Sequence, residues 1–150
     1  MDDLAPRPAR VLLALTGVTV AVVGAWASFA PRSFYDDFPG FGLLWVNVDG
    51  PYNRHLVTDV GGLQLAVAFL LLTAVVLGSR RLVLVAAATA LVTAVPHLTY
   101  HLFHRDGYEQ LDLVTSLVSL TFAVVLPAVA LLLAWPRTSQ PSAEVVGVQR

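Results

Sequence analysis

The third long apolar segment of the chain and the residue that follows it carry three of the four histidines. His97 and His101 are four residues apart and His101 and His104 are three apart, so in a helix all three side chains lie on one face. Two imidazoles held one helical turn apart suit a single metal ion, and zinc, copper and iron all accept imidazole nitrogen. The spacing therefore predicts a transition-metal site, with His97 as its first ligand because it lies deepest in the segment.

Carboxylates follow a similar pattern in the two neighbouring apolar segments. Asp59 lies four residues after His55 in the second segment, and Asp112 opens the fourth, with Ser116 on nearly the same face. A metal-bound histidine usually donates its other ring nitrogen to a carboxylate, so each aspartate is expected to act as a ligand or as such an acceptor. Ser116 and Tyr100 are expected to support the ligands from outside.

The expected helical hairpins place these residues at one depth in the membrane. Counting back from turns near Ser79 and Gly107 puts Asp59 and Asp112 close to the level of His101. Ionisable groups that face lipid are costly, so they usually face the interior of a bundle and pair with one another. We therefore expect three helices to form one metal-binding cluster from His97, His101, Asp59, Asp112, His104 and His55.

Several functions fit such a cluster. A metal ion with a free coordination position would suit a membrane oxidoreductase or hydrolase. Haem fits less well than a non-haem metal, because His97 has no histidine at its own depth on a facing helix. The main alternative is a non-catalytic scaffold or accessory subunit in which the same residues form a structural polar clasp. A proton-handling or ligand pocket is a third reading, and whether the chain is an enzyme stays open.

The elements that must position these residues are membrane-spanning helices. Apolar residues make up 57 % of the chain and charged ones only 13 %, with a mean hydropathy of +0.73, which is too apolar for a soluble surface. Four segments are each close to the ~20 residues that cross ~30 Å of hydrocarbon. They cover about 11–30, 56–77, 82–103 and 111–135. Since lipid satisfies no backbone amide, we predict an all-α integral membrane protein, a four-helix bundle with antiparallel up-down topology.

The arginines predict how this bundle is oriented. Six of the nine fall on the side of the two termini and three on the other, and the side with more arginine is usually cytoplasmic. Residues 1–10 and the polar tail 136–150 are therefore expected in the cytoplasm, the tail as a disordered segment, in a multi-pass protein of the plasma membrane. The first segment resembles a cleaved signal peptide, but it is too long for one, so we expect it to be retained.

An aromatic loop of residues 31–53 joins the first two spans on the outer side. Its five most prominent aromatic side chains, Phe34, Tyr35, Phe38, Phe41 and Trp45, are of the type that settles among lipid headgroups. The loop is therefore an interfacial anchor in one reading. In the other it is a lid over the polar cluster, because it ends directly at His55.

Partners other than lipid are poorly defined by the sequence. There is no cysteine, which excludes disulfides and thiolate sites, and a net charge of −1 gives no support for nucleic-acid binding. Small residues recur along the first span at Gly17, Ala21, Gly24 and Ser28, a stripe that lets a second helix approach closely. A homo-oligomer or another membrane protein is a possible partner.

Two stretches carry a resemblance to a known family: SFYDDFPGFGLLWVNVDGPYNRHLVTDVGGLQLA and VPHLTYHLFHRDG. They cover about a third of the chain and resemble a family of small four-helix membrane proteins from actinobacteria. The shorter GGLQLA is also similar to DoxX-like membrane families. The resemblance implies the four-helix fold and no particular activity. It further implies an acidic residue at the position of Arg54, so that this position is not expected to be a metal ligand.

Overall fold

The computed structural model describes residues 3–136 and contains four long helices that are apolar enough to cross a membrane. These helices are α1 (Arg7–Phe29), α3 (Arg54–Leu77), α4 (Arg80–Phe103) and α5 (Gln110–Ala134). The predicted all-α, four-helix membrane bundle is confirmed. Each helix begins one to four residues before its predicted span, because arginine or a polar residue is tolerated at the membrane surface. Most of the tail expected to be disordered, residues 137–150, lies outside the described residues.

The α3–α4 turn is held by the segment that precedes α1. α3 is followed by Gly78, whose φ of 67° is the left-handed conformation that stops a helix at low cost when no Cβ is present. The carbonyl of Gly78 accepts a hydrogen bond from Ala5 N–H at 2.9 Å, and Arg80 N–H donates to the carbonyl of Asp3 at 3.0 Å. The chain start and the α3–α4 turn are therefore fixed at one end of the bundle, called here the termini end.

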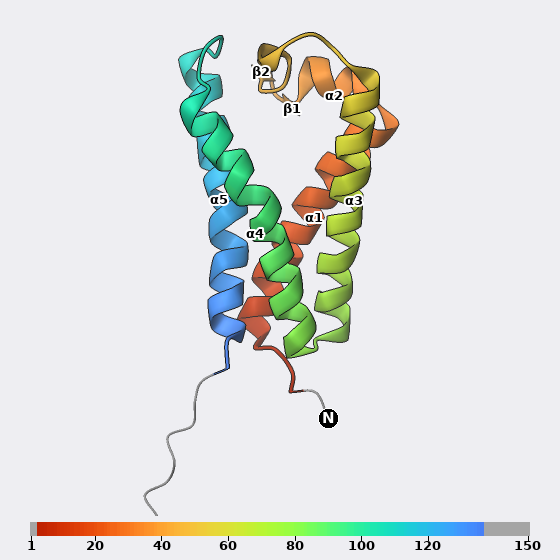
Figure 1. Cartoon of the computed structure of the whole chain (residues 1–150), viewed down its shortest axis with the longest axis vertical. Coiled ribbons are helices and arrows are strands. Elements are labelled where there is room, and N and C mark those ends of the chain that lie inside the picture. Colours follow the sequence, from red (N-terminus) through yellow and green to blue (C-terminus); the bar gives the residue numbers. More distant parts are fainter. Residues whose placement is uncertain (1–2, 137–150) are drawn as a thin grey trace, which may run out of the picture.

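The four helices pack as two pairs, α1 with α3 and α4 with α5 (Figure 1). The buried core lies toward the termini end, where the pairs meet, and consists mainly of alanine with a few larger residues. Its members include Ala9, Leu13, Leu71, Ala74, Val83, Ala86, Ala87, Ala90, Ala130 and Ala134. Toward the opposite end, called here the loop end, the two pairs diverge (Figure 1).

Residues 31–53 form a compact cap at the loop end. The cap contains α2 (Pro31–Asp37), strands β1 (Pro39–Gly40) and β2 (Leu43–Leu44), and the short helix η1 (Asn47–Asp49). The strands pair antiparallel, with Pro39 opposite Leu44 and Gly40 opposite Leu43. Between them lies the hairpin tip, where Phe41 is fully exposed.

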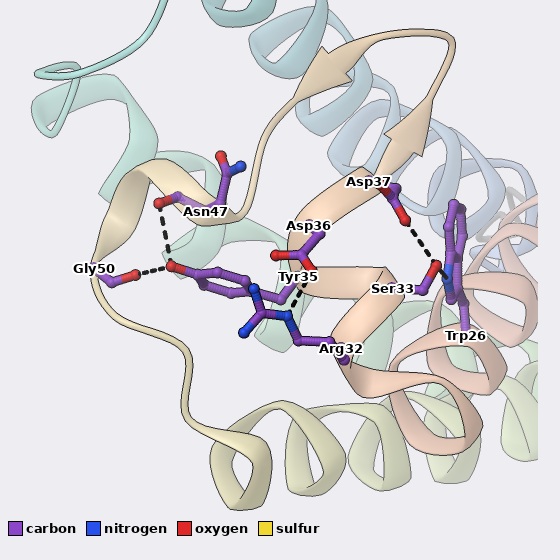
Figure 2. Close-up of polar contacts among 8 residues, drawn as sticks. All are labelled: Trp26, Arg32, Ser33, Tyr35, Asp36, Asp37, Asn47 and Gly50. Atoms are coloured by element: carbon purple, nitrogen blue, oxygen red, sulfur yellow. Dashed lines mark hydrogen bonds and ion pairs between the residues drawn. The ribbon is translucent and has the colours of Figure 1, made fainter.

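Polar contacts close this cap on itself (Figure 2). The hydroxyl of Tyr35 donates its hydrogen to the carbonyl of Gly50 and lies 3.4 Å from the carbonyl of Asn47, which ties α2 to η1 and the residue after it. Trp26 Nε1–H donates to Ser33 Oγ at 3.2 Å, and Ser33 in turn donates to Asp37 at 3.0 Å, which ties α1 to α2.

An aromatic cluster joins α1, α2 and the cap, and it differs in part from the interfacial-anchor reading. Trp26, Phe34, Phe38 and Trp45 lie with neighbouring ring centroids 4.7–6.2 Å apart, and Phe34 is buried. These rings pack against one another, because apolar surface is removed from water more completely inside the cap than at its face. Of the five loop aromatics, Phe41 at the tip is the one left fully exposed.

Candidate functional site

His97 and His101 form a direct pair on α4. Their Nε2 atoms lie 3.1 Å apart and their ring centroids 5.0 Å apart. One helical turn separates the two residues, so both rings project from the same face, as their spacing predicts. His101 is buried, whereas His97 is exposed at the protein surface about 9 Å below the loop end of α4, counted as six residues of helical rise.

Tyr108, in the turn between α4 and α5, fixes the hydrogen on the His101 ring. Its hydroxyl donates to the carbonyl of Trp45 at 2.9 Å and lies 3.3 Å from His101 Nδ1. Because a hydroxyl has one hydrogen, which goes to Trp45, the Tyr108 oxygen accepts from His101 Nδ1–H. His101 Nε2 is then left with its lone pair facing His97.

Asp49 of η1 supplies a negative charge to the surroundings of this group. Its carboxylate lies within electrostatic reach of His97, His101 and Tyr108. Burial first, and then the charge of Asp49, raise the pKa of the Tyr108 phenol to about 12. Neither Asp49 nor Tyr108 was among the residues predicted from the sequence. The lid reading of residues 31–53 was the only signal for them. Asp49 belongs to that segment, and Tyr108 binds the carbonyl of Trp45, which also belongs to it.

Asp112 binds the cap instead of a histidine. Its Oδ1 accepts a hydrogen bond from Leu44 N–H at 3.2 Å, and the residue is buried. One turn further along α5, Thr115 Oγ1 accepts from Trp45 Nε1–H at 3.3 Å. Ser116, expected to support a ligand, is buried on the same helix. The start of α5 therefore anchors the strand β2 and Trp45.

His55 and Asp59 pair with each other on α3. His55 Nε2 lies 3.3 Å from Asp59 Oδ2, and both side chains are largely exposed. They belong to the α1–α3 pair of helices, which diverges from α4 and α5 at the loop end (Figure 1). The predicted meeting of Asp59 with the α4 histidines is not formed.

His104 and Tyr100 make a separate stack at the end of α4. Their rings lie 4.1 Å apart with an interplanar angle of 8°, and His104 Nδ1 lies 3.0 Å from the carbonyl of Tyr100. Tyr100 also meets His101 edge-on, with centroids 5.3 Å apart. Tyr100 therefore supports His101 by packing, whereas His104 is turned toward its own helix.

The structure does not assemble the six-residue metal cluster. Within residues 3–136 no three histidine, aspartate or glutamate side chains are placed to hold one metal ion. Depth counting placed the residues at a common level but gave no information on lateral distance. Because the helix pairs separate above the core, the cluster divides into His97–His101, His55–Asp59, and Asp112 with the cap.

The fold defines a multi-pass membrane protein with four spanning helices and a folded cap at one end. Comparisons with protein-family models, with curated proteins and with solved structures found no match.

Proposed function

We propose that this membrane protein binds a transition-metal ion, zinc, copper or iron, at its loop end through His97 and His101. The observation that carries the proposal is the 3.1 Å separation of the two Nε2 atoms. Two nitrogens bound at about 2.0–2.1 Å to a tetrahedral zinc ion lie roughly 3.3 Å apart, so the distance between the two Nε2 atoms is close to the one that a shared ion requires.

Tyr108 supports this role for His101. A ligating histidine is usually oriented by a hydrogen bond from its other ring nitrogen, and Tyr108 accepts such a bond from Nδ1–H. Nε2 of His101 therefore carries a lone pair and no hydrogen, which is the form of imidazole nitrogen that binds a metal ion.

Two histidines leave the remaining coordination positions open. Asp49 is a carboxylate whose charge acts on both histidines, and water or a substrate would complete the shell. An open position is the condition for hydrolase or oxidoreductase chemistry. Haem fits this pair less well, because its axial ligands lie on opposite faces of a planar ring, whereas these histidines are neighbours on one helix.

The experiment is elemental analysis of the full-length protein after equilibration with zinc, copper or iron and removal of excess metal. Wild type is expected to retain about one ion, and His97→Ala and His101→Ala should lose most of it, since each removes half of the protein ligands. His104→Ala is the matched control, because His104 stacks on Tyr100 outside the pair. Equal, substoichiometric metal in wild type and His97→Ala would contradict metal binding.

A second candidate is the non-catalytic scaffold or accessory subunit, and a different observation favours it. Leu44 and Trp45 are hydrogen-bonded at three points to the α4–α5 unit, through Asp112, Thr115 and Tyr108. This arrangement is a polar clasp that holds the cap. In this reading the cap is the functional surface, and the histidines help to hold it in place.

Asp112→Ala tests the clasp, and metal content separates the two candidates. Loss of a buried hydrogen bond to a carboxylate costs roughly 1.5–3 kcal/mol, so proteolysis within residues 38–53 should accelerate at least tenfold. Asp106→Ala, at an exposed position in the nearby turn, is the control. For the scaffold, Asp112→Ala alters the cap while no variant changes metal content.

A further inference from the structure

A small cavity that is largely open to the protein surface lies between α1 and α3 at the termini end. It has a volume of about 250 Å³ and is lined by Arg7, Arg10, Val11, Ala14 and Val75. Two arginines thus line the cavity together with apolar residues, close to the start of α1. The loop-end site and this cavity share no residue.

Arg10 is held in position by the end of α3. Its Nε and Nη2 both donate to the carbonyl of Val75, at 3.1 and 2.7 Å. That carbonyl belongs to the last turn of α3, where partial negative charge accumulates and no intrahelical partner is available. The third nitrogen, Nη1, is not used in this contact, so Arg10 is preorganised and still has a donor to offer.

Arg7 adds a second positive charge without a counterion in the described structure. It is exposed, and no ion pair joins it to another residue within 3–136. The nearby carboxylate of Asp3 binds Arg80 at 2.8 Å. The first turn of α1 contains no acidic residue and has no side-chain cap, so the partial positive charge of the helix start adds to that of the arginines.

An apolar stripe continues from the cavity along α1. Its members Val11, Leu15, Val18 and Val22 are 53–59 % exposed and recur at steps of four, three and four residues. Eleven residues of helix rise roughly 16 Å, which is close to the ~15 Å thickness of one hydrocarbon leaflet. The stripe therefore has the length of a single acyl chain.

We propose that this cavity and stripe bind one anionic phospholipid, its phosphate against Arg7 and Arg10 and an acyl chain along α1. Guanidinium groups recognise phosphate through paired, charge-assisted hydrogen bonds. Basic pockets between spanning helices are suited to anionic headgroups for the same reason. A free phosphate ion shares the headgroup chemistry but makes no use of the apolar stripe.

The test is native mass spectrometry of the full-length protein with phosphatidylglycerol or phosphatidylcholine of identical acyl chains. Wild type is expected to retain one phosphatidylglycerol in preference to phosphatidylcholine. Arg7→Gln should weaken that retention about fivefold, the effect of one arginine at an anionic membrane surface. Arg81→Gln is the matched control, because Arg81 is exposed at the same end but does not line the cavity.

Three outcomes would overturn the proposal. Equal losses in Arg7→Gln and Arg81→Gln would mean that the lipid responds only to the general charge of this end. Equal retention of the two lipids would mean that apolar contact alone is responsible. In a separate arm with inorganic phosphate as the probe, thermal stabilisation equal to that by phosphatidylglycerol, and lost in Arg7→Gln, would assign the site to a soluble anion.

Discussion

Tyr108 connects the two parts of the molecule that meet at the loop end. It donates to Trp45 of the cap and accepts from His101 of α4, while its own position is in the turn between α4 and α5. A phenol in this place must stay neutral, because ionisation would remove its only donor and would put a second anion near Asp49.

The free energy of unfolding should therefore decrease at high pH as the Tyr108 phenol ionises. Its pKa is about 12 in the folded protein and about 10 in an unfolded chain. Since the folded state holds the proton more tightly, the stabilisation is complete below pH ~10 and is lost as pH rises toward ~12. We expect Tyr108→Phe to lose less stability over this window, measured by thermal unfolding in detergent. An unchanged pH dependence would contradict this role.

Local spacing was sufficient to predict the His97–His101 pair but not its surroundings. Two residues four apart on a helix share a face whatever else the protein does, so their contact follows from the sequence alone. Tyr108 and Asp49 reach the pair through the folded cap, which depends on contacts between residues far apart in the chain. No short-range pattern reports such contacts.

At the scale of elements, α1 and α3 approach each other through glycine. A Cβ atom added at Gly61 would lie 2.6 Å from the backbone nitrogen of Ser28, and one at Gly24 would lie 2.9 Å from that of Leu65. In lipid, helices associate by close packing because water does not drive apolar surfaces together there. The small-residue stripe predicted along the first span is therefore part of this interface.

Gly61→Ala should loosen the α1–α3 pair, and its neighbour provides the control. The added methyl group meets backbone that cannot move aside, so we expect a destabilisation of about 1–3 kcal/mol. Nothing lies within 4 Å of a Cβ atom added at Gly62, so Gly62→Ala should be neutral or stabilising by up to ~1 kcal/mol through helix propensity. Thermal unfolding of both variants in the same detergent measures the difference, and equal melting temperatures would contradict the close contact.

At the scale of the whole molecule, the four helices were predictable but their divergence was not. Length and apolar composition identify a spanning helix, because the bilayer sets both requirements. Lateral arrangement in lipid depends on side-chain fit, and apolar residues face both lipid and neighbouring helices, so periodicity gives little guidance. The failed prediction that Asp59 meets the α4 histidines has this cause. The depth of Asp59 could be inferred from the sequence, but the distance between α3 and α4 at that depth could not.

The orientation of the molecule in the membrane is a separate prediction, which rests on its arginines. Arg7, Arg10, Arg80 and Arg81 lie at the termini end, and three arginines lie at the loop end. The sequence after α5 contains two more arginines, Arg137 and Arg150, outside the described residues. Because basic residues are retained on the cytoplasmic side, the cap should face outward and the lipid site inward.

The absence of cysteine makes a direct test of this orientation simple, since any introduced thiol is the only one. Phe41→Cys places it at the fully exposed tip of the cap, and Arg81→Cys at an exposed position of the termini end. A membrane-impermeant maleimide should label Phe41→Cys in intact cells and Arg81→Cys only after permeabilisation. Asp106→Cys, in the α4–α5 turn, should behave like Phe41→Cys. It is the control for the case in which the Phe41 tip is protected from the reagent by lipid headgroups. Labelling of Arg81→Cys in intact cells, with protection of the other two thiols, would mean that the orientation is the reverse of the predicted one. Arg7 and Arg10 would then lie at the outer leaflet.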